Sequence, residues 1–240
     1  MALTIPERIA QVAEHFARHD AHGYSQPNRG TGGTERVTLS DGSTVTVTDS
    51  DVDCSEMVRQ CVNAAISGSH ASPIVYLWTG NEDEELRAQG FVRMAYSPTA
   101  VRRGDVLWVK GHTGVALGNG KQADAHGDEV GGITGPRRGD QTGREVEVRD
   151  LRSWTYIYRH ADAGTTPIAA TFRVTAAGEA NVRDAPSMGG KVTGTLRPGE
   201  RVECDGWLEA EGRIWATYVA YSGRRRYVSL GYAHNWVVVS

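Results

Sequence analysis

The sequence predicts an α+β domain followed by a small all-β domain. A part with helical periodicity precedes short β-type runs that begin near residue 105, and this order is typical of α+β architecture. A small, polar, proline-terminated stretch occupies residues 161–167, and the chain beyond it alternates as short strands do. We therefore expect a first domain at 1–162, a linker at 163–168 and a second domain at 169–240.

The first expected elements are an amphipathic helix, a hairpin and a second helix. Apolar residues with the spacing of one helix face predict the first helix: Ile5, Ile9, Val12 and Phe16. Alternation on both sides of Asp41-Gly42 predicts a β-hairpin over 36–49. The second helix is expected to begin at Cys54, because the residues on one of its sides are apolar: Met57, Val58, Cys61, Val62 and Ile66.

Short β-type runs make up the rest of the first domain. Separated by glycine-rich turns, they cover 105–109, 113–118, 121–126 and 152–160. Before them, the acidic segment 81–86 is expected to be a solvated helix start. Residues 127–143 hold six glycines, which predicts a long loop, and we expect it beside the candidate catalytic residues Cys54, His112 and Asp124.

The second domain is predicted from strands alone. Glycine and proline turns, among them Arg197-Pro198-Gly199-Glu200, separate the β-type runs. About 70 residues of short strands are enough for a small barrel or sandwich. The expected strands cover 171–175, 180–183, 191–196, 200–204, 213–221, 225–230 and 234–239.

Composition indicates an ordinary globular protein and excludes several classes. Hydrophobic residues make up 39% and charged residues 23%, and the net charge of −3 gives no basic field that would attract nucleic acid. No run of about 18 apolar residues is present, so no membrane insertion is expected. The three widely spaced cysteines predict neither a disulfide framework nor a zinc knuckle. We expect a monomer without a cofactor.

Three histidines lie along and just beyond the first helix, at spacings of four and three residues: His15, His19 and His22. A metal site would need a further Cys, Asp or Glu ligand, and no partner motif is visible in the sequence. We therefore expect a solvated histidine-bearing face and no metal site.

Cys54 is the candidate nucleophile. It follows a turn-forming acidic run and begins a helix, where unpaired backbone N–H groups and the helix dipole favour a thiolate. The alternative is that Cys54 is a small buried hydrophobe, because free cysteines are often buried. Cys61, seven residues further along the same helix, is expected to fill the core.

Four motifs in this order resemble the NlpC/p60 cysteine peptidases of peptidoglycan, the papain-like wall hydrolases of bacteria and their phages. The motifs are GYSQPNRG at 23–30, DCS at 53–55, RRGDVLWVKGHTGVALGNGK at 102–121 and QADAH at 122–126. The stretch GDQTGREVEVR at 139–149 is similar to phage-type members. The resemblance implies a papain-like catalytic domain, with helices packed on an antiparallel sheet, and a thiol protease activity.

The resemblance also implies a catalytic triad of Cys54, His112 and Asp124. His112 opens the strand where the family's base lies, and an imidazole that titrates near neutrality can take the thiol proton. Asp124 stands where the family has its polar third residue, which is histidine in many members. His126 is the alternative third member, since it lies on the same strand face as Asp124.

The resemblance also implies roles for Tyr24, Asp53 and Ser55, either in stabilising the oxyanion or in contacting substrate. The backbone N–H of Cys54 and the hydroxyl of Tyr24 are the expected oxyanion donors. Asp53 and Ser55 flank the nucleophile and are expected to touch substrate. From the residues alone, Tyr24 could instead be a packed aromatic, Asp53 a helix N-cap and Ser55 a first-turn residue.

The tail at 169–240 resembles a bacterial SH3-like domain. The resemblance rests on ANVRDAPSMGGKVTGTLRPGERVE at 180–203, with its opening strand, its turn and its hairpin. Its second half, with RIWATYVAYSGRRRYVS, is less similar to that family. A role in binding the cell wall is implied.

Together the two resemblances imply a peptidoglycan hydrolase of the endolysin type that acts at the bacterial cell wall. The expected reaction is cleavage of the stem peptide between D-glutamate and the diamino acid. The alternatives are an N-acetylmuramoyl-L-alanine amidase of the same fold and a catalytically silent wall-binding protein. The N-terminus has no signal-peptide pattern, which fits a phage-type lysin released by other means or a chain lacking its leader.

Overall fold

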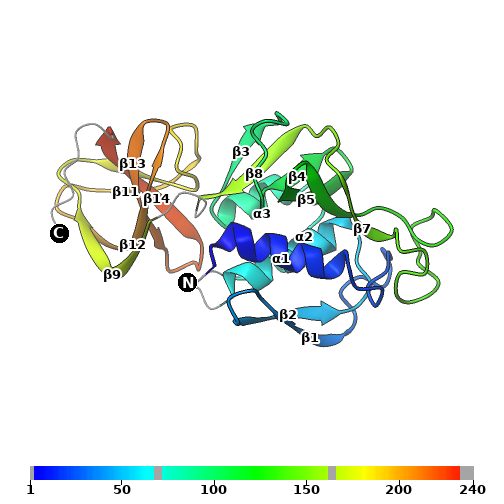
Figure 1. The fold of residues 1–240 in the computed structure, drawn as a ribbon. Helices are drawn as coiled ribbons and strands as arrows, with labels where there is room; N and C mark the ends of the chain where they lie inside the picture. The colour runs from blue at the N-terminus through cyan, green and yellow to red at the C-terminus, as the bar shows by residue number, and fades with distance from the viewer. Residues whose placement is uncertain (1–2, 68–71, 162–165, 233–240) are drawn as a thin grey trace. The chain divides into compact units, whose positions relative to one another are not determined.

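Figure 1 shows the computed structural model, which describes residues 3–67, 72–161 and 166–232. The first unit combines helices and sheets and the second consists mainly of strands, so the predicted α+β class is confirmed. Within the described ranges, no helix is long and apolar enough to cross a membrane. The contacts divide the chain into two compact units, residues 1–69, 73–83 and 93–159, and residues 70–72, 84–92 and 160–240.

Helix α1 (Ile5–Phe16) forms where the apolar spacing predicts it. The Thr4 hydroxyl caps its N-terminus by accepting a hydrogen bond from the Glu7 N–H at 3.3 Å. The apolar stripe is buried, and the helix packs against α2 (Cys54–Ile66). The N-terminal helix therefore supports the helix that begins with the candidate nucleophile.

Strands β1 (Gly33–Thr38) and β2 (Thr44–Asp49) form the predicted hairpin and pair antiparallel. Gly42 in the turn has a φ of 83°, a left-handed conformation that glycine adopts without strain. Val45 and Val47 are buried, and β2 packs on α2. The hairpin thus covers part of the same helix.

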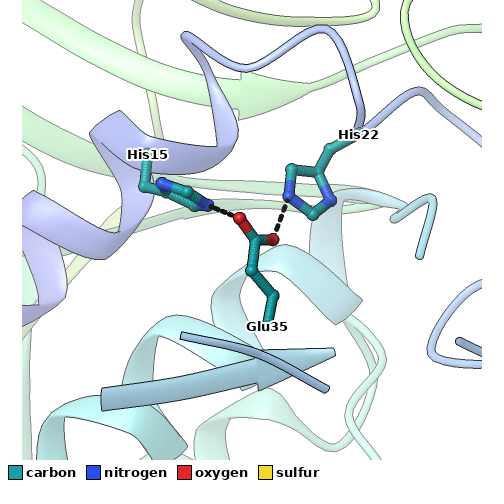
Figure 2. Close-up of side chains that lie close together, drawn as sticks. All are labelled: His15, His22 and Glu35. Carbon is teal, nitrogen blue, oxygen red and sulfur yellow. Dashed lines mark hydrogen bonds and ion pairs between the residues drawn. The ribbon is translucent and has the colours of Figure 1, made fainter. Parts of the chain in front are cut away.

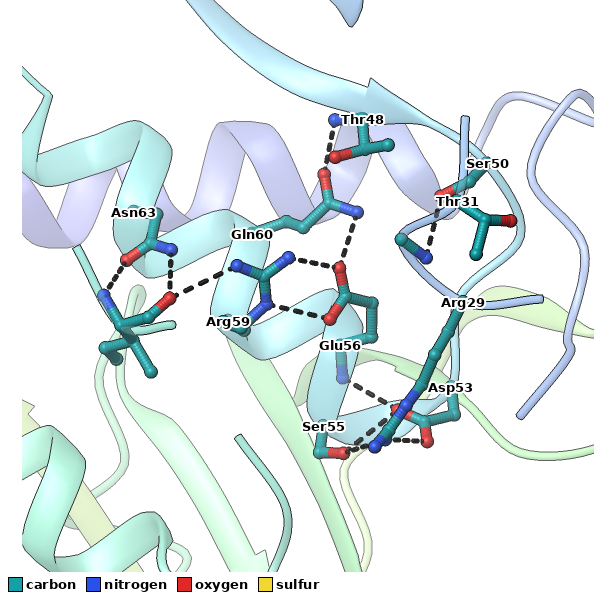
Figure 3. Close-up of polar contacts among 12 residues, drawn as sticks. Arg29, Thr31, Thr48, Ser50, Asp53, Ser55, Glu56, Arg59, Gln60 and Asn63 are labelled. Atoms are coloured by element: carbon teal, nitrogen blue, oxygen red, sulfur yellow. Dashed lines mark hydrogen bonds and ion pairs between the residues drawn. The ribbon is translucent and has the colours of Figure 1, made fainter. Parts of the chain in front are cut away.

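Helix α2 begins at Cys54 because Asp53 caps it. The Asp53 carboxylate accepts a hydrogen bond from the Glu56 N–H at 2.7 Å and satisfies one of the free donors of the first turn. Figure 3 shows how the helix is tied to the hairpin: the Gln60 side chain accepts from the Thr48 N–H at 2.5 Å. The position of the helix is therefore fixed by the Asp53 cap at its start and by the contact of Gln60 with the hairpin.

A six-stranded sheet forms the second layer, in the order β3-β8-β4-β5-β6-β7. Helices α1 and α2 pack on β5 and β6, and a core cluster gathers Leu107, Ala116, Trp154 and Ile157. Strands β4, β5, β6 and β8 correspond to predicted runs, whereas β3 and β7 have no counterpart among them. The bounds are β3 (Phe91–Ala95), β4 (Val106–Val109), β5 (His112–Gly118), β6 (Lys121–Ala125), β7 (Val146–Asp150) and β8 (Tyr156–His160).

Residues 127–143 form a long loop without helix or strand, as predicted. The Asp128 carboxylate accepts hydrogen bonds from the backbone N–H groups of Val130, Gly132, Thr134 and Gly135. The Asp140 carboxylate accepts from the N–H groups of residues 142–146. Two aspartates therefore satisfy backbone groups that would otherwise need a helix or a sheet.

The loop packs directly on the segment that carries Tyr24. A Cβ added to Gly135 would lie 2.2 Å from the Tyr24 carbonyl oxygen, so glycine is required for this approach. The Ser25 hydroxyl also donates to the Thr134 carbonyl at 2.9 Å. The expected position of the loop beside the candidate site is therefore confirmed.

The second unit contains a six-stranded sheet in the order β11-β10-β14-β13-β12-β9. Leu208, Trp215 and Tyr227 form its buried cluster. Strand β9 begins inside the predicted linker 163–168, while residues 162–165 and the predicted strand 234–239 lie outside the described residues. The bounds are β9 (Thr166–Thr175), β10 (Ala180–Arg183), β11 (Val192–Leu196), β12 (Arg201–Ala210), β13 (Arg213–Val219) and β14 (Arg225–Tyr232).

Candidate active site

Cys54 lies in the first turn of α2 and is only 9% exposed. The backbone N–H groups of Thr113 and Ser55 act on its sulfur and favour its ionised form. Thr113 is the second residue of β5, and α2 packs on this strand. The candidate nucleophile therefore lies against the beginning of the strand that starts with His112.

The pKa of Cys54 is raised to about 12. Burial is the largest cause and the negative charge of Asp53 adds to it, while the N–H groups of Thr113 and Ser55 act in the opposite direction. The expectation that the helix N-terminus makes Cys54 a thiolate is therefore wrong for the resting protein. A base has to remove the thiol proton when the reaction begins.

His112 and Asp124 face each other from adjacent strands. The Nε2 atom of His112 lies 3.0 Å from Oδ2 of Asp124, and β5 pairs antiparallel with β6. The Asp124 side chain is fully buried, while that of His112 is 17% exposed. Because Nε2 of His112 is hydrogen-bonded to Asp124, the other ring nitrogen, Nδ1, is available for proton exchange with a thiol.

The Asp124 carboxylate is held in its ionised form. Burial alone would raise its pKa, but the hydrogen bond from His112 and the positive charge of His112 and His126 bring the pKa of Asp124 below its ordinary range. The Gln122 amide also donates to Oδ2 at 2.9 Å. The Nδ1 atom of His126 lies 3.7 Å from Oδ1, longer than an ordinary hydrogen bond. Of the two candidates for the third position, Asp124 is the one in contact with His112.

Sequence reasoning missed two members of this cluster, Gln122 and Trp154. The Trp154 ring stacks on the His112 ring, with centroids 5.6 Å apart and planes inclined by 11°. The Gln122 Oε1 atom accepts from the Trp154 indole N–H at 3.0 Å, so one amide fixes both the ring and Asp124. Gln122 could have been suspected because it shares a strand face with Asp124. No local pattern places Trp154 beside His112.

Glu82, the first residue of α3 (Glu82–Ala88), is fully buried, so the expectation of a solvated helix start is wrong at this position. The Thr113 hydroxyl lies 2.5 Å from Glu82 Oε1 and 2.9 Å from the Leu107 carbonyl oxygen. A hydroxyl has one hydrogen and a carbonyl only accepts, so a protonated Glu82 supplies the second hydrogen. Burial raises the pKa of Glu82 to about 8, and the charge of Asp53 acts in the same direction.

Tyr24 is buried and lies beside the nucleophile segment through a parallel bridge to Val52. Its hydroxyl oxygen accepts a hydrogen bond from the Gln26 amide at 3.3 Å, which leaves the hydroxyl hydrogen available for donation. Burial raises the pKa of Tyr24, and negative charge on Cys54 and Asp53 adds to the effect. Tyr24 is therefore a packed aromatic that keeps its proton close to Cys54.

Asp53 and Ser55 are both engaged within the protein, as Figure 3 shows. Asp53 forms an ion pair with Arg29 and accepts from the Ser55 hydroxyl at 2.9 Å. Arg29 also donates to the Ser55 hydroxyl at 3.1 Å and to the Tyr76 hydroxyl at 2.8 Å. The helix-cap and first-turn interpretations are thus observed, and contact with substrate stays a prediction for both residues.

One group of side chains has the composition of a metal site: His15, His22 and Glu35 (Figure 2). His22 is fully buried, so the expectation of a solvated histidine-bearing face is wrong for this residue. Glu35 lies on β1 and supplies the carboxylate that the sequence pattern does not reveal. Strand β1 brings it to the histidines from 13 residues beyond His22.

Two family models match the chain. One described as an endolysin-like domain matches residues 2–123 and 122–182, and one described as a bacterial SH3 domain matches residues 165–230. Among curated proteins, the probable autolysin PH of Staphylococcus aureus (strain NCTC 8325 / PS 47) is 41% identical over 51 residues. That match covers 21% of this chain and 10% of the relative, so the chain spans a small part of the relative's length.

Solved structures with similarity to the chain are of two kinds. An SH3b domain in complex with L-canavanine is 29% identical, with 28% of this chain and 71% of that chain covered and a TM-score of 0.26. The structure of Ly7917 with the hydrolysing product of MDP covers 96% of this chain and 94% of that chain, at 14% identity and a TM-score of 0.33. At these TM-scores the likenesses carry no argument about activity.

Proposed function

The chain belongs to the endolysin-like domain family, and from this premise we propose that it is a peptidoglycan hydrolase of the NlpC/p60 cysteine-peptidase type. The proposal rests above all on the pairing of His112 with the buried Asp124, next to the strand position that contacts Cys54. The order of the four motifs that resemble the NlpC/p60 family supports it. The bond cut is an amide of the stem peptide.

In the first step, the Cys54 sulfur attacks the carbonyl carbon of that amide. The thiol proton passes to Nδ1 of His112, and Asp124 stabilises the imidazolium through Nε2. Because burial raises the pKa of Cys54 in the resting protein, His112 is the proposed acceptor of this proton as the sulfur attacks. The imidazolium then gives its proton to the leaving amine, and a thioester remains on Cys54.

The negative oxygen that develops in this step needs donors. The backbone N–H of Cys54, in the first turn of α2, and the Tyr24 hydroxyl are the proposed pair. Water, activated by His112, then hydrolyses the thioester and restores the thiol. No cofactor takes part in this sequence.

The scissile bond in this proposal lies between D-glutamate and the diamino acid of the stem peptide. The same chemistry at the bond between muramic acid and L-alanine is the alternative within this fold. Arg29, with its guanidinium beside Asp53 and over the ring of the exposed Tyr76, borders the nucleophile and is the proposed contact for substrate.

The second unit is proposed to bind the wall, on the basis of its match to the bacterial SH3 domain. Binding through a second domain raises the local concentration of the catalytic domain at its substrate. A protein without residues 166–240 is expected to bind purified walls more weakly than the full chain, as measured by co-sedimentation. Equal binding would contradict this assignment.

The catalytic proposal is tested with purified walls and a turbidity assay. Cys54→Ala is expected to abolish clearing, whereas Cys61→Ala and Cys204→Ala retain it, because both of these thiols are fully buried elsewhere. Mass analysis of the released fragments identifies the bond. Clearing by a folded Cys54→Ala protein at the wild-type rate would exclude the mechanism and favour a wall-binding role without catalysis.

A further inference from the structure

Two histidines converge on one carboxylate, and none of the three residues belongs to the proposed catalytic set (Figure 2). The Nε2 atom of His15 lies 3.0 Å from Glu35 Oε1, and the Nε2 atom of His22 lies 2.9 Å from Glu35 Oε2. The three side chains come from α1, from the segment after it and from β1. One ligand atom from each residue lies within 4.8 Å of the others.

The hydrogen bonding of His22 fixes which of its nitrogens carries a hydrogen. Its Nδ1 atom lies 2.9 Å from the Ser50 carbonyl oxygen, which can only accept. Nδ1 is therefore the N–H, and in the neutral imidazole the lone pair of Nε2 points at the Glu35 carboxylate. Two acceptors at 2.9 Å repel each other unless a cation lies between or beside them. A backbone carbonyl that fixes the tautomer in this way is the usual second partner of a metal-bound histidine.

His15 adds a second nitrogen that lies at ion-pair distance from Glu35 but has no hydrogen bond. Its Nε2 atom is buried and makes no hydrogen bond of acceptable geometry, although Glu35 Oε1 is only 3.0 Å away. An unpaired buried nitrogen is costly unless something else satisfies it. A cation bound between the three side chains would satisfy this nitrogen and the Glu35 carboxylate together.

The spacing of the donors fits a small transition-metal ion. Zinc binds imidazole nitrogen at about 2.0–2.1 Å and carboxylate oxygen at about 2.0–2.2 Å, so tetrahedral ligand atoms are about 3.3 Å apart. The two nitrogen–oxygen distances, 3.0 and 2.9 Å, end on different oxygens of Glu35, and one ligand atom from each residue lies within 4.8 Å of the others, so a small side-chain movement brings both nitrogens and one oxygen to this spacing. Two imidazoles and one carboxylate suit zinc, whereas calcium and magnesium prefer oxygen ligands alone.

We propose that His15, His22 and Glu35 bind one divalent transition-metal cation of the zinc type, with water in the remaining position. The cation joins α1, the β1–β2 hairpin and the segment that leads from His22 to Tyr24. The proposed role of the cation is structural, because it links three separate parts of the chain to one another. A metal that binds the folded but not the unfolded chain raises stability.

The test uses the full chain with Cys54→Ala, so that the proposed nucleophile cannot act as a zinc ligand. After treatment with a chelator and removal of the chelator, zinc is titrated by calorimetry and thermal unfolding is followed with and without zinc. We expect one zinc ion per chain with affinity that depends on Glu35, a higher melting temperature with zinc, and no comparable effect of calcium.

Three variants on this background identify the ligands: His15→Gln, His22→Gln and Glu35→Gln. Each is expected to weaken zinc binding by about 100-fold or more, because even loss of an outer hydrogen-bond partner costs 10–100-fold. Glu35→Gln keeps the shape of a partly exposed side chain, so it remains informative if the buried His22 variant fails to fold. His19→Gln is the matched control, since His19 lies on the same segment and is exposed.

The outcomes separate the proposal from its rivals. Unchanged zinc binding in Glu35→Gln, or absence of saturable zinc binding in the Cys54→Ala chain, overturns it and leaves a proton as the cation between His22 and Glu35. An equal loss of affinity in His19→Gln also overturns the assigned ligand set. Binding and a stability gain that disappear in the three variants and persist in His19→Gln support the site.

Discussion

Among the residues that the structure describes, two carboxylates, Glu35 and Asp124, each lie between two histidines, and the two arrangements differ in symmetry. Glu35 receives His15 and His22 at nearly equal distances, 3.0 and 2.9 Å. Asp124 receives His112 at 3.0 Å and His126 at 3.7 Å, and it is fully buried, whereas Glu35 is 29% exposed. A carboxylate that is close to only one imidazole, as Asp124 is to His112, holds that imidazole in one orientation. A carboxylate that is equally close to two imidazoles, as Glu35 is, leaves a place between the three side chains where a cation can bind.

The surroundings of the two carboxylates reinforce this difference. Asp124 also accepts from the Gln122 amide, and the His112 ring that it orients is stacked on Trp154. At Glu35 the supporting contact is instead the carbonyl of Ser50, which directs a lone pair of His22 toward the carboxylate. The cluster around Asp124 thus holds the imidazole of His112 in place. The cluster around Glu35 instead directs nitrogen and oxygen lone pairs toward the same place.

The largest expected effect comes from breaking the asymmetric cluster. Asp124→Ala should reduce turnover of wall fragments by about 10²–10⁴-fold, because His112 loses both its orientation and the stabilisation of its imidazolium. Asp124→Asn should recover part of the rate, because the amide still orients the ring. The matched change Glu35→Gln should leave turnover within a few-fold of the wild type below its melting temperature. Similar losses in both variants would contradict the division of roles.

The buried carboxyl of Glu82 extends the comparison, because it pairs with a hydroxyl instead of a histidine. The unfolded carboxyl has a pKa near 4.5 and the folded one has a pKa of about 8, raised by burial. Between these pH values the folded protein keeps a proton that the unfolded chain releases, so stability should fall as the pH rises through this window. The loss is on the order of a few kcal/mol, at about 1.4 kcal/mol per pKa unit.

Glu82→Gln should remove this pH dependence, since the amide resembles the protonated acid. Thermal unfolding from about pH 5 to about pH 8 should show an increasing advantage of the variant over the wild type. Glu84→Gln, an exposed change on the same helix, is the control and should follow the wild type. Parallel curves for Glu82→Gln and the wild type would show that Glu82 is ionised in the folded protein.

The smallest expected effect is that of His126→Ala. At 3.7 Å from Asp124 and 3.6 Å from Glu147, His126 is held by long ion pairs and does not touch His112 through a described hydrogen bond. Steady-state turnover of wall fragments should therefore change by no more than a few-fold. If His126→Ala is inactive and Asp124→Ala nearly normal, the third member of the triad is His126.

Sequence reasoning succeeded where the information is local. The stripe of α1, the Asp41-Gly42 turn and the capped start of α2 all depend on residues close together in the chain. The pairing of His112 with Asp124 was also expected, from the resemblance to the NlpC/p60 family, and the short turn between their strands fixes the register that brings them together.

The remaining features depend on contacts between distant segments. Trp154 reaches His112 from beyond the long loop, and Glu35 reaches His22 from a hairpin strand, so no spacing in the sequence reveals either neighbour. The protonation of Cys54 was missed for a different reason. The helix terminus was visible in the sequence, but the depth of burial that outweighs it is a property of the packed fold.

The residues of the long loop 127–143 differ in how much a substitution would disturb the backbone of the loop. Asp128 and Asp140 fix the backbone, and Gly135 must stay glycine because of its approach to Tyr24. Val130 and Ile133 are exposed and take no part in that framework through their side chains. Substitution of Val130 or Ile133 is therefore expected to change the surface of the loop, while the path of the loop and the position of Tyr24 stay the same.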